Sequence, residues 1–124
     1  MEKTVTIDNQ KIRLKVTAGC VRMYKLQFRR DLIKDVFKMK KLEKYLVDGE
    51  LIMSDEAIAA IDFEVFSDLL WVFAKKADST IPGPMEWEDS FTAIPFREIY
   101  PEVIGMLTIL LDGQKKQVAQ AGVK

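Results

Sequence analysis

The sequence predicts a small α+β domain, mostly α, in which an N-terminal β-hairpin precedes a compact bundle of about four to five helices. Three observations lead to this fold class. Near the N-terminus apolar residues alternate with polar ones, which is the period of a strand. From position 18 onward they recur every three to four residues, which is the period of a helix. The 124 residues correspond to one domain.

The first expected element is the hairpin, within "TVTIDNQKIRLKV". Its apolar residues with a two-residue period are Val5, Ile7, Ile12, Leu14 and Val16. Between the two runs, Asp8, Asn9 and Gln10 supply a polar turn. This pattern predicts two antiparallel strands with one face toward the core.

Two helices are expected next. Thr17 is the predicted N-cap of a helix that begins near Ala18. Asp31 is a candidate cap for the second helix, and the sequence leaves open whether the two are continuous through Arg30 and Asp31. The residues expected to face the core are Val21, Tyr24, Phe28, Leu32, Val36, Phe37 and Met39.

A long central helix is expected over about 55–77, with Ser54 as its N-cap. Its two apolar rows are Ile58, Ile61, Val65, Leu69 and Phe73 on one side and Ala60, Phe63, Leu70 and Ala74 on the other. Its expected solvent-facing row is Glu64, Asp68, Trp71 and Lys75. Trp71 must therefore be either exposed or covered by another segment.

The stretch "ADSTIPGPMEWEDSF", residues 77–91, interrupts the helical pattern because the turn at 81–84 contains two prolines and a glycine. Such a turn would reverse the chain and lay Met85 and Trp87 over Trp71. Closure of a satellite core by these aromatic rings is favoured over a pocket or partner groove. A short helical turn is expected within "MEWEDSF".

Prolines mark the expected starts of the last helices, because proline is favoured at the first helical position. Pro95 opens one helix and Pro101 the next, which is expected to end at the glycine stop Asp112-Gly113. This last helix is apolar nearly all round, so it is either a central core element or a surface for a partner. The domain would then span 1–113, with a flexible tail at 114–124.

Composition argues against catalysis. The chain has no histidine, which excludes Ser-His-Asp and Cys-His catalysis and imidazole metal sites. Cys20 is the only cysteine, and no glycine-rich phosphate motif is present. The N-terminus lacks the apolar stretch of a signal peptide, and no apolar run is long enough for a membrane span. We therefore expect no enzyme activity, no cofactor or metal, no membrane partner and a reducing cytoplasm.

The candidates for partner binding are two tryptophans, a residue type common at binding hot spots, and apolar residues of the last helix. They are Trp71, Trp87, Met106, Ile109 and Leu110.

A net charge of zero hides a strong division of charge along the chain. Residues 11–44 carry 12 Lys/Arg and 3 Asp/Glu, a net charge of +9, whereas residues 45–112 carry 3 and 14, a net charge of −11. Three explanations are open: internal complementarity, head-to-tail association into a homo-oligomer, and nucleic-acid binding by the basic region. Nucleic acid is the least favoured, because the basic region lacks interleaved stacking aromatics.

The order of these features resembles the tail assembly chaperones of long-tailed (siphovirus-type) bacteriophages and related prophages. The resemblance covers about residues 1–113 and lies in patterns of core residues, with no catalytic signature. Its elements are "TAGCVRMYKLQFRRDLIKDVFKM" (Thr17-Ala18, Arg22, Tyr24, Phe28 and Arg30-Asp31), "LLWVFAKKAD", "WEDSF", Pro95 and the closing apolar helix.

The resemblance implies a non-catalytic protein of the host cytoplasm, absent from the mature virion. Such a protein binds the long, helical tape measure protein and keeps it soluble while the tail tube assembles. In this family a longer form, often made by ribosomal frameshifting, recruits the tail tube protein; Gln114-Lys115-Lys116 can be encoded by a slippery heptamer. The alternatives are a structural head–tail or tail morphogenesis protein, and a small nucleic-acid-binding protein that uses the basic region 11–44.

Overall fold

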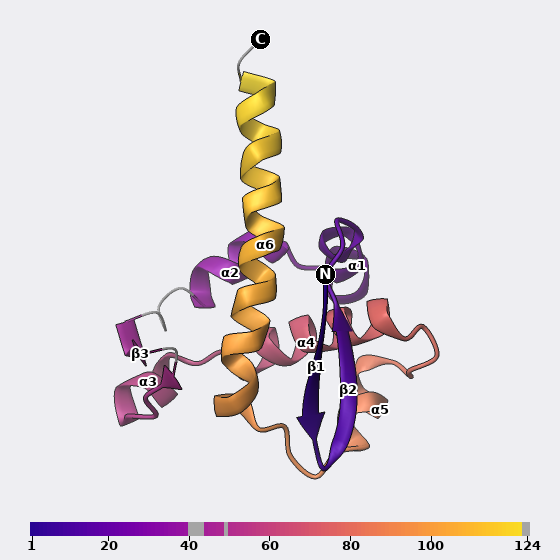
Figure 1. Cartoon of the computed structure of the whole chain (residues 1–124), viewed down its shortest axis with the longest axis vertical. Helices are drawn as coiled ribbons and strands as arrows, with labels where there is room; N and C mark the ends of the chain where they lie inside the picture. The colour runs from indigo at the N-terminus through magenta and orange to yellow at the C-terminus, as the bar shows by residue number, and fades with distance from the viewer. Residues whose placement is uncertain (40–43, 49, 123–124) are drawn as a thin grey trace.

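A β-hairpin followed by helices is what the computed structural model shows, which confirms the predicted fold class. The structure describes residues 1–39, 44–48 and 50–122, without the side chains of Leu51 and of 113–122. In chain order its elements are β1 (Glu2–Ile7), β2 (Gln10–Lys15), α1 (Gly19–Phe28), α2 (Leu32–Met39), β3 (Leu46–Val47), β4 (Glu50–Leu51), α3 (Asp55–Ala60), α4 (Phe63–Ala77), α5 (Pro84–Asp89) and α6 (Phe96–Gly122) (Figure 1).

The N-terminal hairpin forms as the alternation predicts. β1 and β2 pair antiparallel, with Ile7 opposite Gln10 at the closed end. Asp8 and Asn9 form the turn with φ angles of 52° and 61°, the left-handed conformation that Asp and Asn tolerate and that a two-residue hairpin turn requires. The core-facing side of the hairpin buries Val5, Ile7, Leu14 and Val16, with Ile12 partly buried.

The start of α1 differs by one residue from the prediction. Ala18, not Thr17, is the N-cap, and it makes no side-chain capping bond. The carbonyl of Thr17 instead accepts a hydrogen bond from the Cys20 N–H at 3.1 Å, so the chain turns before the helix begins.

α1 and α2 are two separate helices. Arg29 adopts the left-handed conformation (φ 58°) and ends α1. Asp31 Oδ1 then accepts the N–H of Ile33 at 2.8 Å, which confirms Asp31 as the cap of α2. Leu32, Val36 and Met39 are buried as predicted. The prediction that Phe37 faces the core is wrong, since Phe37 is 60% exposed on the opposite side of α2.

The predicted single helix over 55–77 is divided into α3 and α4. Ser54 Oγ accepts the N–H of Ala57 at 3.2 Å, as expected for the N-cap of α3. Asp62 is a second N-cap and starts α4. Its backbone is extended, and its Oδ1 accepts the N–H of Val65 at 3.1 Å. The apolar period continues through this break, so periodicity alone does not reveal it.

α4 is the central helix of the fold, in contact with β2, α1, α5 and α6. Its predicted core residues Val65, Leu69, Leu70, Phe73 and Ala74 are buried. The break before α4 takes Ile58 and Phe63 out of the predicted rows, and both are exposed. The predicted solvent-facing row is wrong for Asp68 and Trp71, which are buried under α1 and the loop that follows α4.

α6 is one helix where two were expected. It begins at Phe96, directly after Pro95, and runs through Pro101 instead of restarting there, since the φ angle of proline suits a helix and only one N–H is lost. It also runs through Asp112 and Gly113, because glycine permits a helix end without imposing one. The predicted boundary between a domain at 1–113 and a tail at 114–124 therefore falls inside helical backbone as far as Gly122.

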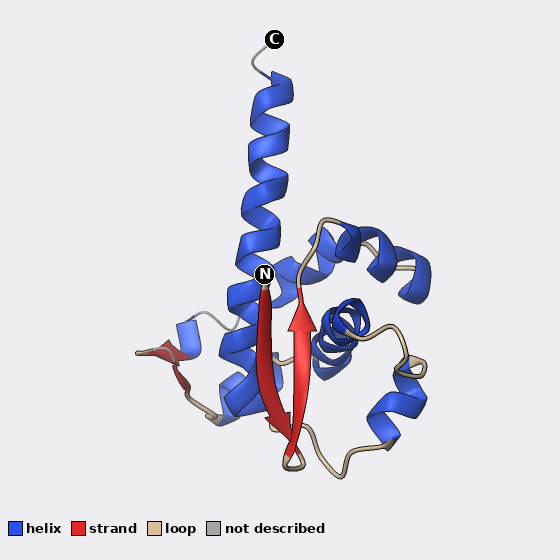
Figure 2. Ribbon diagram, turned by 45° about the vertical axis from the view of Figure 1, so that its right-hand side comes forward, coloured by secondary structure: helices blue, strands red, loops and turns tan. Residues whose placement is uncertain are grey.

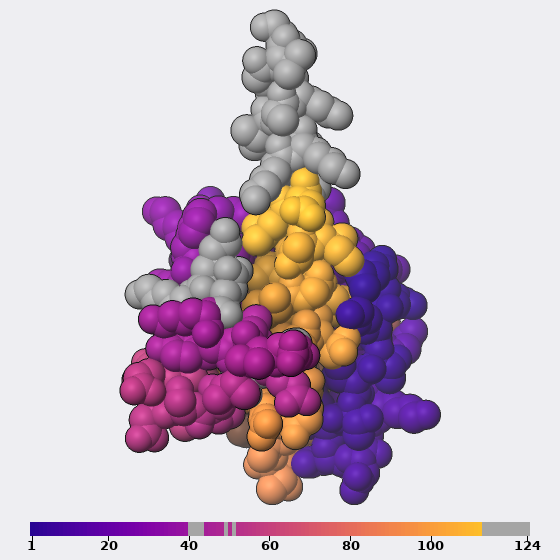
Figure 3. Space-filling view, turned by 60° about the vertical axis from the view of Figure 1, so that its left-hand side comes forward, coloured from indigo at the N-terminus to yellow at the C-terminus, as the bar shows by residue number. Residues whose placement is uncertain are grey.

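α6 packs by one face and not on all sides. The face turned to the body buries Ile99, Tyr100, Val103, Met106, Leu107 and Leu110, whereas Ile109 is exposed. Figure 3 shows the N-terminal half of α6 between the hairpin and the 44–60 segment, and Figure 2 shows the hairpin beside α6 and α4. The Lys3 ammonium bonds Glu102 at 2.8 Å and joins β1 to α6.

We expect amide protection in α6 to decline beyond Asp112. The C-terminal part of the helix extends past the rest of the molecule (Figure 1), and a helical segment of about ten residues is marginal without packing. Hydrogen exchange followed by NMR or mass spectrometry measures this. Protection through 114–122 equal to that of 99–110 would contradict the predicted flexible tail.

Candidate protein-interaction site

Four of the five predicted partner-binding residues lie inside the molecule. Trp71, Trp87, Met106 and Leu110 are buried, and Ile109 alone of the five is substantially exposed, at 48%. The five do not form one surface, because Trp71 and Trp87 belong to α4 and α5 and the other three to α6. Whether any of them contacts a partner stays a prediction.

The loop after α4 closes over Trp71. The indole Nε1–H of Trp71 donates to the carbonyl of Pro82 at 2.9 Å, and its ring meets Phe28 edge-to-face at 5.9 Å. Among the described residues Trp87 instead pairs with Phe91, so the two tryptophan rings are not paired with each other. The expected fold-back of Met85 is wrong, since Met85 is 79% exposed on α5. Both tryptophans thus serve the core closure that the sequence favours.

Arg30, in the link between α1 and α2, forms a cluster with buried acidic groups. Its Nε donates to Asp35 at 2.9 Å, and its Nη2 donates to the Tyr24 hydroxyl at 3.0 Å. The Tyr24 hydroxyl in turn donates to Asp35 at 2.6 Å. From α4, Asp68 accepts a bond from Nη2 and Glu64 one from Nη1 at 3.2 Å. This Arg30 cluster is a contact between the basic and acidic regions inside one molecule, as internal complementarity requires.

The two buried aspartates of the Arg30 cluster are shifted in opposite directions. Burial raises the pKa of Asp35, but hydrogen bonds from Tyr24 and Arg30, with the Arg30 charge, outweigh it and hold this pKa below its usual value. At Asp68 burial dominates and raises the pKa above its usual value, although Arg30 opposes the shift. Ionised Asp35 therefore stabilises the fold, whereas ionised Asp68 is less well compensated.

We expect Asp35→Asn to destabilise the fold more than Asp68→Asn at pH 7. Asp35 stabilises the fold above the pKa of an unfolded aspartate, about 3.9, and loses this contribution as pH falls through its lower folded pKa. Asp68 has the opposite effect, because its pKa is higher in the folded protein than in the unfolded chain. Lowering the pH from 7 toward about 3.9 therefore makes the contribution of Asp68 to folding more favourable. Urea unfolding of both variants from pH 7 to pH 3 measures this; a larger loss for Asp68→Asn at pH 7 contradicts it.

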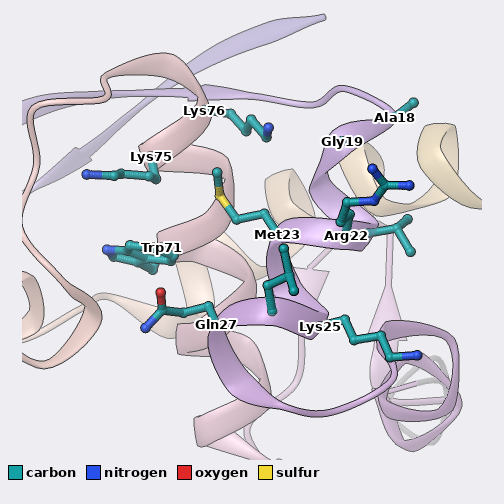
Figure 4. Close-up of a pocket in the computed structure, with 11 residues that line it drawn as sticks. Ala18, Gly19, Arg22, Met23, Lys25, Gln27, Trp71, Lys75 and Lys76 are labelled. Atoms are coloured by element: carbon teal, nitrogen blue, oxygen red, sulfur yellow. The ribbon is translucent and has the colours of Figure 1, made fainter.

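An open groove of about 930 Å³ runs along the solvent-facing side of α1 beside the C-terminal half of α4 (Figure 4). We call this the α1 groove; it is lined by residues 18–19, 21–23 and 25–27 of the α1 region and by Trp71, Lys75 and Lys76 of α4. A depression of about 420 Å³ adjoins it, lined by Arg22, Lys25, Leu26 and Arg29. The two share three residues, so they form one hollowed surface along α1.

The α1 groove is basic and partly apolar. Its residues include no aspartate or glutamate, and Leu26 is 70% exposed in its wall. Arg22, Lys25 and Arg29 form no salt bridge with any described residue. Lys75 differs, because its ammonium donates to the carbonyls of Ser79 and Ile81 at 2.8 and 2.7 Å. The surface thus combines unpaired cations with exposed apolar area.

A second group of exposed apolar side chains lies between β3 and the start of α4. It comprises Val47, Ile52, Met53, Ile58 and Phe63. Acidic residues are interspersed with them, including Asp55 and Glu56 in the first turn of α3. Exposed apolar area of this kind marks a surface that other proteins can contact.

Among the described residues no cluster of acidic or thiol groups could hold a metal ion, and no helix is long and apolar enough to cross a membrane. Every buried side-chain nitrogen and oxygen in the described part has a hydrogen-bond partner. The buried polar side chains of this part are therefore satisfied by groups of the protein itself.

Sequence reasoning missed Leu26 and Met23 as candidate contact residues. Both fall off the buried stripe of α1, and Leu26 lies among arginines and lysines. A leucine on the basic side of an amphipathic helix is the signal that the sequence offers for this surface.

Comparison with protein-family models, with curated proteins and with solved structures gives no match for this chain.

Proposed function

We propose that the protein is a tail assembly chaperone, a non-catalytic protein that binds a tape measure protein and keeps it soluble during tail tube assembly. It would act in the host cytoplasm and be absent from the mature virion. The proposal begins from the resemblance over residues 1–113, in which a hairpin precedes basic-apolar helices and a closing apolar helix.

The observation that carries the proposal is the surface along α1, where the exposed Leu26 and the partly buried Met23 lie beside cations without a described ion partner. A tape measure protein is long and largely helical, so its unassembled helices expose apolar faces. A chaperone for such a client needs apolar contact area that covers the apolar faces of the client. It also needs charged groups around that area, which select the client by charge complementarity. The α1 groove and the exposed side chains at 47–63 both offer this combination.

The tail tube protein is the second proposed partner, recruited by a longer form of the chain. A frameshift at Gln114-Lys115-Lys116 would replace the residues after Lys116, within α6, with the extra domain. Because the backbone at Gln114, Lys115 and Lys116 is helical, the joint would begin as helix where the sequence suggested a flexible link. Self-association through basic and acidic surfaces of different copies also stays a proposal.

Co-expression tests the proposed function. The tape measure protein encoded beside this chain is expected to be insoluble alone, and to stay soluble and co-elute in size-exclusion chromatography when this chain is present. An unrelated aggregation-prone helical protein should remain insoluble in the same cells. Absence of rescue would overturn the proposal, and detection of the chain in purified virions would favour a structural head–tail or tail morphogenesis protein.

Nucleic-acid binding by the basic region 11–44 is the second candidate. The observation in its favour is the row formed by Arg22 and Lys25 of α1 and by Arg29 at its end, which form no salt bridge with a described residue. Binding by phosphate contacts would weaken steeply with salt for any sequence of DNA or RNA. A gel-shift titration at two salt concentrations distinguishes this candidate from a chaperone.

A further inference from the structure

We propose that the α1 groove is the docking site for an acidic amphipathic helix of a partner protein. This inference rests on the proposed function, since it names the surface and the kind of client segment that a helix-binding chaperone would recognise. It is carried by three features of the groove: an apolar strip, cations on both sides of that strip, and the absence of acidic lining residues.

The apolar strip consists of the exposed Leu26 and the partly buried Met23 of α1. Met23 and Leu26 are separated by one helical turn, so they lie on the same side of α1. Leu26 is 70% exposed, and Met23 lies between α1 and α4 in Figure 4. Covering them would remove apolar area from water at about 25 cal/mol per Å². A partner must therefore bring an apolar stripe of its own.

Cations lie on both sides of this strip. On one side Arg22, Lys25 and Arg29 follow α1 at helical spacing over about 10 Å, given a rise of about 1.5 Å per residue. On the other side Lys76 of α4 reaches the first turn of α1, where its Nζ lies 2.9 Å from the place a Cβ on Gly19 would take. Figure 4 shows Lys76 apart from Arg22 and Lys25.

Charge complementarity therefore selects the occupant. A helix that packs beside α1, at an interaxial distance of about 8–10 Å, places an apolar stripe on Met23 and Leu26. The stripe occupies positions i, i+3, i+4 and i+7 of the partner helix. Glutamates or aspartates on both flanks of the stripe would then meet the cations on either side of the groove. A basic helix would be repelled, because no carboxylate lines the groove.

Nucleic acid fits this groove less well. Phosphates would neutralise the cations but would leave Leu26 and Met23 without apolar contact. Trp71 cannot act as a stacking platform, because it is 3% exposed and its ring is packed against Phe28. The groove therefore matches the amphipathic character of a protein helix better than a nucleic-acid backbone.

The test uses the whole chain and a defined probe. The probe is a fluorescent peptide of about 20 residues, long enough to be helical, with leucines at i, i+3, i+4 and i+7 and glutamates on both flanks. One control peptide carries lysine in place of each glutamate, and another carries serine in place of each leucine. Fluorescence anisotropy is expected to show binding of the acidic amphipathic peptide alone, weakened between 0.1 M and 1 M salt.

Two groove variants and a charge-matched control locate the site. Arg22→Glu combined with Lys25→Glu should weaken peptide binding by at least about tenfold, since two attractive pairs become repulsive. Leu26→Ala should weaken it by roughly tenfold through lost apolar contact. Lys11→Glu combined with Lys34→Glu makes the same change in net charge at exposed positions outside the groove and should leave binding unchanged. Circular dichroism and thermal unfolding establish that each variant is folded.

The outcomes separate this inference from the proposed function. Peptide binding that the groove variants abolish supports the docking site, even if co-expression fails to rescue the tape measure protein. Failure of the chain to bind the acidic peptide, or equal binding by the groove variants, overturns the docking site, while the co-expression result decides the chaperone role independently. Binding of an oligonucleotide through Arg22 and Lys25 in preference to the peptide also overturns it.

Discussion

Replacing Arg30 with alanine should lower the free energy of unfolding by about 2–4 kcal/mol, since removing one partner of a buried ion pair leaves the other uncompensated. Arg30 bonds Asp35, Asp68 and the Tyr24 hydroxyl, and both aspartates are buried. Its guanidinium also lies over the Tyr24 and Phe28 rings, at 5.6 and 5.7 Å from their centroids. Urea unfolding monitored by circular dichroism measures the loss.

Two variants control for the removal of charge and of side-chain volume. Arg30→Lys keeps the positive charge, but an ammonium lacks the planar fork of donors with which a guanidinium bonds several acceptors. It should therefore be more stable than Arg30→Ala and less stable than the unchanged protein. Arg22→Ala removes an arginine that has no salt bridge with a described residue and should change stability by less than about 0.5 kcal/mol. Equal stability of Arg30→Ala and Arg22→Ala would mean that the Arg30 cluster does not hold α1 and α2 to α4.

Local features of the chain predicted most of its secondary structure. Two-residue alternation with Asp8-Asn9 was enough for the hairpin, and the side chains of Asp31 and Ser54 identified two helix starts. The errors came where one local signal opposed another. Asp62 caps α4 inside an uninterrupted apolar period, and Pro101 lies in a helix whose remaining hydrogen bonds outweigh the one that it removes.

The surfaces could not be predicted in the same way, because burial of polar and aromatic residues depends on distant partners. Asp68 looked solvent-facing on its own helix, and it is buried because Arg30, 38 residues earlier in the chain, supplies the compensating charge. Trp71 is buried because the loop brings the Pro82 carbonyl to its indole N–H. Conversely, Leu26 stays exposed because no described segment of the chain packs over it, which a helical period cannot reveal.

Trp87→Ala should be more disruptive still, with an expected loss of about 3–5 kcal/mol, as is typical of a buried tryptophan truncated to alanine. Trp87 is 4% exposed and meets the Phe91 ring edge-to-face at 5.1 Å. Its backbone N–H donates to the Gly83 carbonyl, so the same residue joins α5 to the proline turn. Thermal and urea unfolding of the variant measure the loss, with near-ultraviolet circular dichroism to follow the packing of the remaining aromatic residues.

Met85→Ala is the matched control, since Met85 lies two residues away on α5 and is 79% exposed. It removes an apolar side chain from the same short helix and should change stability by less than about 0.5 kcal/mol. If Trp87→Ala instead left stability intact and abolished binding of the proposed partner, a tape measure protein, the loop would be a partner-binding element and not a core closure. If Met85→Ala alone reduced that binding, the exposed side of α5 would join the α1 groove as a contact surface, while Trp87 kept its structural role.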